Sequence, residues 1–62
     1  GYNFTPRDTF YYARELYYNK KYKKAISYFN KFLNMKDAWI ENKISACIDL
    51  ANIYYIKNDE KN

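Results

Sequence analysis

The sequence YKKAISYFNKFL, residues 22–33, decides the fold class. Its apolar residues recur at intervals of three, one, three, three and one, which is the period of one face of an α-helix and not the alternation of a β-strand. They are Tyr22, Ala25, Ile26, Phe29, Phe32 and Leu33. We therefore predict an amphipathic helix over about residues 22–34.

Another helix is predicted before it, over about residues 6–19. Thr5 suits the N-cap, Pro6 suits the first helical position, and Asp8 suits both a capping box and the positive end of the helix. Asn19 is expected to take a left-handed cap conformation at the other end, before a tight turn. The stripe that faces the core is Phe10, Ala13, Leu16 and Tyr17.

A third helix is predicted over about residues 38–57, with Asp37 as its N-cap. It carries two apolar rows, and a helix that is apolar on two sides needs cover on both. One row is Ile40, Ile44, Cys47, Ile48, Ala51, Tyr54 and Tyr55, and the other is Ala46, Leu50 and Ile53.

The expected fold is all-α, an antiparallel helical hairpin plus a third helix. Because only two helices precede the third, we expect Leu50, Ile53 and Tyr54 to leave an apolar strip that either favours self-association or leaves the chain poorly stable.

The composition argues against most enzyme and metal chemistry. The chain has 62 residues with no His, one Cys and one Gly. It therefore lacks the usual general base, a disulfide, a thiolate zinc site and a glycine-rich phosphate loop. A domain of this length buries only about 60% of its unfolded surface, too little to enclose a sizeable cleft. We expect no enzymatic activity, no cofactor and no metal in this chain.

Aromatic residues make up 23% of the chain, and each ring can bury roughly 150–250 Å². This is how so short a chain can assemble a core. The lone thiol favours a cytoplasmic location, and no apolar run approaches the ~18 residues of a membrane span.

The chain resembles itself at a fixed offset. Residues 16–20, LYYNK, echo residues 54–58, YYIKN, and Ala13 corresponds to Ala51, an offset of 51 − 13 = 38 residues. Repeats of 20–50 residues indicate stacked helical hairpins. With the predicted helix lengths, the pattern resembles the tetratricopeptide repeat, whose period is about 34 residues. The resemblance implies one and a half repeats, and we expect the chain to be part of a larger protein.

That resemblance also implies packing positions. Ala13 and Ala25 would let the two hairpin helices approach closely, while Tyr22 and Phe29 fill the space around that contact. The full set of expected packing residues is Ala13, Leu16, Tyr22, Ala25, Phe29, Ala51 and Tyr54. The chain departs from the family pattern at Lys20 in place of the turn glycine, at Phe32 in place of a small residue and at Asp37 in place of the closing proline.

Two stretches, FYYARELYY at residues 10–18 and WIENKISAC at residues 39–47, carry a second likeness. Residues 5–56 look like the helical-repeat segment that follows the catalytic domain in bacterial family 2 glycosyltransferases. The resemblance implies a parent enzyme that transfers sugar from a nucleotide-sugar donor, with its catalytic acidic motif in an upstream domain outside this chain. It makes this chain a non-catalytic interaction or scaffold module; the alternative is a free-standing module that binds an extended peptide.

One face of the first predicted helix carries Arg7, Tyr11, Arg14 and Tyr18, spaced by four, three and four residues. By register this face resembles the concave face of repeat arrays, and Ser45, Asn52 and Ile56 offer the same groove from the third helix. Arg14, Tyr18 and Asn52 would bind an extended peptide or a sugar-bearing acceptor, Arg by pairing with anions and Tyr by stacking. The alternative is that they are ordinary surface or packing residues.

Three other features are interpreted as structural. The basic cluster Lys20, Lys21, Lys23 and Lys24 could attract nucleic acid or an acidic membrane, but the net charge of +4 is modest and no nucleic-acid motif accompanies it. We interpret it as a solvated turn with Tyr22 facing the core. Cys47 is expected to be a buried small apolar residue, with a nucleophile as the alternative. Trp39 is expected to pack at the hairpin junction, with contact to a partner as the alternative. The expected partner is a protein or peptide, or the parent's own catalytic domain, with no nucleic acid and no membrane span.

Overall fold

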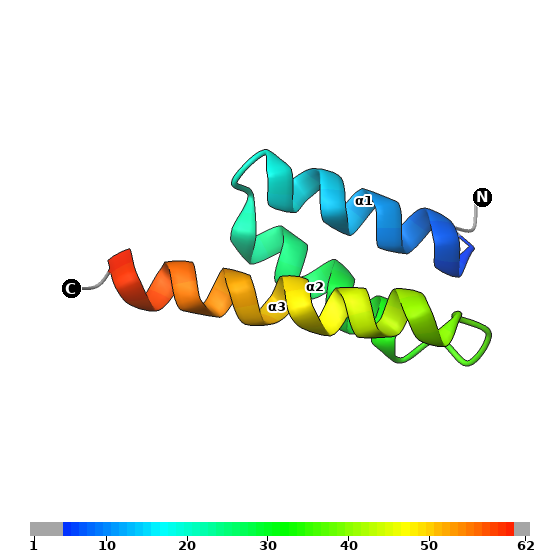
Figure 1. Cartoon of the computed structure of the whole chain (residues 1–62). Helices are drawn as coiled ribbons and strands as arrows, with labels where there is room; N and C mark the ends of the chain where they lie inside the picture. The colour runs from blue at the N-terminus through cyan, green and yellow to red at the C-terminus, as the bar shows by residue number, and fades with distance from the viewer. Residues whose placement is uncertain (1–4, 61–62) are drawn as a thin grey trace.

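The computed structural model describes residues 5–60, except for the side chain of Glu60. This range holds three α-helices and no strand: α1 at Pro6–Tyr18, α2 at Tyr22–Leu33 and α3 at Ile40–Glu60. In Figure 1, α1 and α3 run in the same direction, and α2 runs back in the opposite direction and crosses behind α3. The prediction of an all-α fold built from a helical hairpin and a third helix is confirmed.

α1 begins at the predicted capping box. The backbone N–H of Asp8 donates to Thr5 Oγ1 at 3.2 Å, and the N–H of Thr5 donates to Asp8 Oδ2 at 3.3 Å. Pro6 occupies the start of the helix, where a backbone donor would have no partner in the helix. Local side-chain chemistry thus fixes where α1 starts.

The turn between α1 and α2 differs from the prediction in one residue. Asn19 caps α1 with an ordinary φ of −89°, and Lys20 takes the left-handed conformation with φ 62°. The N–H of Lys21 donates to the carbonyl of Leu16 at 2.8 Å, and that of Lys20 to Tyr17 at 3.0 Å. These two bonds form a Schellman motif, which requires its left-handed residue one position after the cap. Lys20 therefore adopts the conformation for which glycine is usually selected.

The core draws on all three helices and is aromatic where α1 meets α2. The ring of Phe10 lies 5.1 Å from that of Phe32 and 6.3 Å from that of Phe29, measured between centroids. All three rings are almost fully buried, as are Ala13 and Ala25. Leu16 is also buried, and Tyr22 is half-buried with its ring 6.2 Å from that of Tyr17.

α3 starts later than predicted. Its first turn is closed by the N–H of Lys43 donating to the carbonyl of Trp39 at 3.0 Å, so Trp39 and not Asp37 occupies the capping position. Asp37 lies in a turn that carries the chain from α2 to α3. Trp39 is 72% exposed, so the prediction that it packs at the hairpin junction is wrong.

The hairpin covers only one of the two apolar rows of α3. Ala46, Leu50 and Ile53 are buried against it, so the expectation that Leu50 and Ile53 stay exposed is wrong. Cys47, Ala51 and Tyr54 belong to the other row and are exposed. The packing predicted for Ala51 and Tyr54, and the burial predicted for Cys47, are therefore not realised within residues 5–60. The reason is that α1 and α2 together offer a single surface to α3.

Candidate functional site

α1 and α3 meet at an ion pair. Arg14 Nε lies 3.2 Å from Asp49 Oδ2, and no other ion pair is found between the side chains of residues 5–59. Neither of these two buried atoms has an aligned hydrogen bond, so the attraction between the two charges is the larger part of the contact. Asp49 is only 6% exposed, while about a third of the Arg14 side chain, 34%, remains in contact with solvent.

The environment of Asp49 changes its acidity. Burial raises the pKa of the Asp49 carboxyl above its ordinary value, because the charged form loses its water. The positive charge of Arg14 offsets part of this rise by favouring the carboxylate. The desolvation of Asp49 is therefore only partly compensated by its partner.

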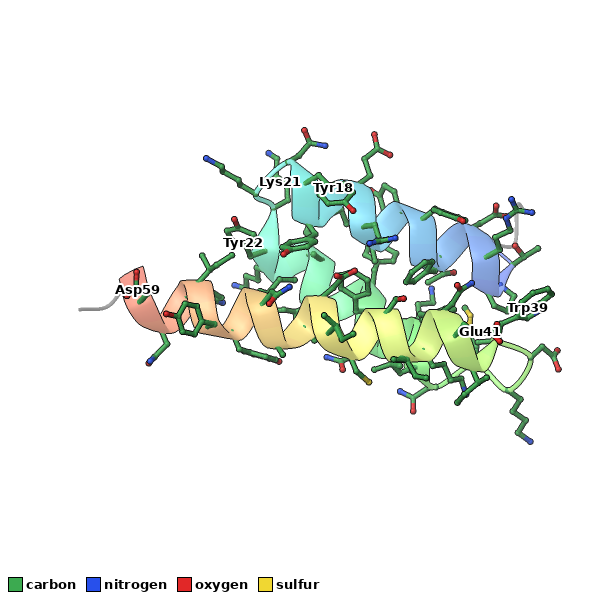
Figure 2. The ribbon with its side chains drawn as sticks, viewed as in Figure 1. Tyr18, Lys21, Tyr22, Trp39, Glu41 and Asp59 are labelled. Carbon is green, nitrogen blue, oxygen red and sulfur yellow. The ribbon has the colours of Figure 1, made fainter. Side chains whose placement is uncertain are left out.

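The predicted row on α1 is a series of cation–aromatic contacts. The guanidinium carbon of Arg7 lies 5.7 Å from the centre of the Tyr11 ring, and that of Arg14 lies 5.7 Å from the centre of the Tyr18 ring. Arg14 also lies 5.3 Å from the ring of Phe10, which links the row to the core. Tyr11 is 52% exposed and Tyr18 is 67% exposed. Figure 2 shows Tyr18 near the end of α1. The row thus presents two ring surfaces and an exposed guanidinium to solvent.

On α3, the structure adds a residue that the sequence analysis missed. Ser45, Asp49, Asn52 and Ile56 follow the same spacing of four, three and four residues as the row on α1. Ser45 and Ile56 are half-buried and Asn52 is exposed. Asp49 could have been found from this spacing, which places a carboxylate at the register position that faces Arg14. Arg14, one of the predicted groove residues, thus contacts α3 through Asp49, which was not predicted.

A pocket of about 480 Å³ lies at the start of α1. Arg7 and Tyr11 contribute to it from α1, and Trp39 and Asn42 contribute from the beginning of α3. In Figure 2, Trp39 lies at the same end of the molecule as the start of α1. The pocket extends the α1 row towards an exposed Trp that the sequence analysis had assigned to packing.

The lysine cluster gathers at the opposite end of the molecule. A shallow hollow of about 470 Å³ is lined by Lys20, Lys21, Tyr22, Lys23, Lys24 and Lys57. Lys57 comes from the last turns of α3, so the cluster combines a lysine of α3 with the four lysines of residues 20–24. Within the described residues, none of these lysines forms an ion pair.

The range of residues 5–60 holds no group of three or more His, Cys, Asp and Glu residues that could bind a metal ion. Within it, every helix is too short or too polar to cross a membrane.

Comparison of the chain with protein-family models, with curated proteins and with solved structures gave no match.

Proposed function

We propose that this chain is a non-catalytic, tetratricopeptide-like interaction module that binds a protein or peptide along α1 and the adjoining side of α3. One observation carries the proposal: the row Arg7, Tyr11, Arg14 and Tyr18 lies on a side of α1 that adjoins α3 at Arg14 and leaves Arg7, Tyr11 and Tyr18 exposed. Ordered rings and guanidinium groups on a rigid helix suit recognition, because little side-chain freedom is lost on binding.

The arrangement of the helices supports the repeat-like part of the proposal. Stacked helical hairpins place the first helix of each repeat beside the first helix of the next. Here α3 runs in the same direction as α1 and joins it through Arg14 and Asp49. The self-similarity between residues 16–20 and residues 54–58 falls on these two helices.

The chemistry of the row indicates what it would bind. Arg7 is exposed and has no carboxylate partner within residues 5–60, so it is the residue best placed to pair with an anion of the ligand. Tyr11 and Tyr18 offer faces on which an aromatic, proline or sugar ring can stack. The charge of Arg14 is already balanced by Asp49, which makes Arg14 an organiser of the face more than a free anion-binding group. An extended peptide with acidic and ring-bearing side chains fits these features.

A titration can test the peptide-binding function. A hexapeptide with alternating Glu and Tyr should shift the backbone amide resonances of α1 and α3 and leave those on the outside of α2 unchanged. Arg7→Ala should weaken binding by about tenfold, the loss of one good charged contact. Lys36→Ala, which removes an equal charge from the exposed turn after α2, is the matched control. Shifts confined to the lysine cluster would contradict the proposal.

A further proposal concerns the parent protein. The likeness of residues 10–18 and 39–47 to the helical segment of bacterial family 2 glycosyltransferases supports a role as the C-terminal helical part of such a cytoplasmic enzyme. In that setting the α1 face would contact the enzyme's own catalytic domain or its acceptor. The gene decides this point, because a parent without an upstream sugar-nucleotide domain would contradict it and favour a free-standing module.

A further inference from the structure

The outer face of α3 carries an apolar seam with the spacing of a coiled coil. Its members lie four, three, four and three residues apart, and they are Ile40, Ile44, Cys47, Ala51 and Tyr54. Ile48 and Tyr55 widen the seam along one side only. All seven side chains are exposed, with Ile40 at 66% and Tyr55 at 75%. A 4–3 spacing keeps apolar residues in line along two helices that pack against each other at a small angle.

The face behind this seam is already occupied. Ala46 and Ile53 are fully buried against the hairpin, and Leu50 is 8% exposed. α3 therefore packs against the hairpin by one face, while the residues of the seam on its other face remain exposed. An apolar surface of this extent is unusual on a monomer and marks an interaction site.

We propose that this seam pairs with the same seam of a second copy of the chain, with the two α3 helices antiparallel and their contact centred on Cys47. The area supports a second copy as the occupant. The three isoleucines and two tyrosines of the seam are 54% to 75% exposed, so the seam presents an area on the order of the roughly 800 Å² that each partner buries in a standard protein interface. Two-fold pairing of one patch with itself is also the commonest form of association for identical chains.

The one-sided position of Ile48 and Tyr55 sets the orientation. In an antiparallel pair, the same flank of each helix faces its counterpart, so Ile48 meets Ile48 of the second copy and Tyr55 lies near Glu41. In a parallel pair, Ile48 would instead face Lys43 and bury part of its charged side chain. The antiparallel pair also sets opposite ends of the two helix dipoles side by side. Burial of the apolar flank therefore favours the antiparallel arrangement.

The middle of the seam suits close approach. Cys47 lies midway between Ile40 and Tyr54, so an antiparallel pair centred there places the two Cys47 side chains opposite each other. The small side chain of Ala51 then faces the larger Ile44 of the second copy. Small residues opposite large ones let the helices pack without leaving a void.

Sedimentation equilibrium tests the pairing. The unaltered chain should approach twice its mass of 7.6 kDa at near-millimolar concentration. Ile44→Glu should weaken association at least tenfold, because each interface would then bury two carboxylates near its centre. Since Ile44 is exposed in the single chain, this variant should fold, and circular dichroism will confirm it. Ser27→Glu adds the same charge at an exposed position on α2 and should associate like the unaltered chain. A single-chain mass for the unaltered protein at near-millimolar concentration would overturn the proposal.

Disulfide exchange tests the orientation. In a Cys47→Ala background, Ile40→Cys and Tyr54→Cys are made separately, mixed and equilibrated in a glutathione redox buffer. An antiparallel pair brings position 40 of one copy beside position 54 of the other, so mixed disulfide dimers should predominate. A predominance of dimers between identical variants would overturn the antiparallel arrangement.

Discussion

Arg14 and Asp49 join the first helix to the third across a distance of 3.2 Å, with the carboxylate almost wholly buried and the guanidinium partly exposed. The two residues are thus unequal partners. Asp49 has given up most of its water, while Arg14 retains part of its hydration. A substitution of Arg14 and a substitution of Asp49 should therefore change the free energy of unfolding by different amounts.

Removal of the arginine should be costly. Arg14→Met leaves a buried carboxylate without its positive partner, and we expect the free energy of unfolding at neutral pH to fall by about 1–3 kcal/mol. Asp49→Asn removes the buried charge and should change the stability by less than about 1 kcal/mol. The double variant should recover most of the loss seen in Arg14→Met. Urea denaturation followed by circular dichroism measures all four free energies, and equal stability of Arg14→Met and the unaltered chain would contradict the expected role of the pair.

The raised pKa of Asp49 predicts a specific dependence of stability on pH. Between the ordinary pKa of an aspartate and its raised value here, the folded chain binds more protons at Asp49 than the unfolded chain does. The contribution of Asp49 to the free energy of unfolding is therefore largest below the ordinary pKa and decreases as the pH rises through this interval. The difference in urea midpoint between the unaltered chain and Asp49→Asn should follow this course. An NMR titration in which the Asp49 carboxyl ionises below its ordinary pKa would reverse the sign and contradict the prediction.

Lys20 offers a stabilising substitution. Its φ of 62° lies in the left-handed region, which costs a residue with a β-carbon roughly 1 kcal/mol. Lys20→Gly should therefore raise the free energy of unfolding, by up to about 1 kcal/mol. Lys31→Gly makes the same chemical change in the last turn of α2, where both the glycine and the loss of a cation are unfavourable, and should lower it by about 0.5–1 kcal/mol. Urea midpoints of the two variants should move in opposite directions, and a shared direction would mean that charge, and not backbone conformation, controls the result.

Thr5 should control the first turn of α1. Thr5→Ala removes the side-chain oxygen that accepts from the Asp8 N–H, and we expect a loss of about 1 kcal/mol in stability. Thr5→Ser keeps that oxygen and should keep most of the stability. Hydrogen exchange should show faster opening of the amides at the start of α1 in the alanine variant. If the alanine and serine variants exchange alike, the capping box does not stabilise this end.

The sequence was most informative where structure depends on near neighbours. The start of α1 followed from Thr5, Pro6 and Asp8, and the buried stripe of α2 followed from its spacing alone. α3 was different, because its two apolar rows are alike in residue type and only the surface offered by the hairpin selects which one is buried. The residues of the groove were also predicted only in part. Arg14 was singled out, but its tie to Asp49 depends on how α3 docks, which the sequence of either helix alone does not determine.

The turn at residues 19–21 has a consequence for the order of folding. It joins α1 to α2 over three residues, so Phe10, Phe29 and Phe32 come together by closing a short loop at little entropic cost. α3 follows a longer connection, and it can pack only against a surface that the hairpin has already formed. The hairpin should therefore act as the nucleus, with α3 adding to it as the last and least protected part of the fold.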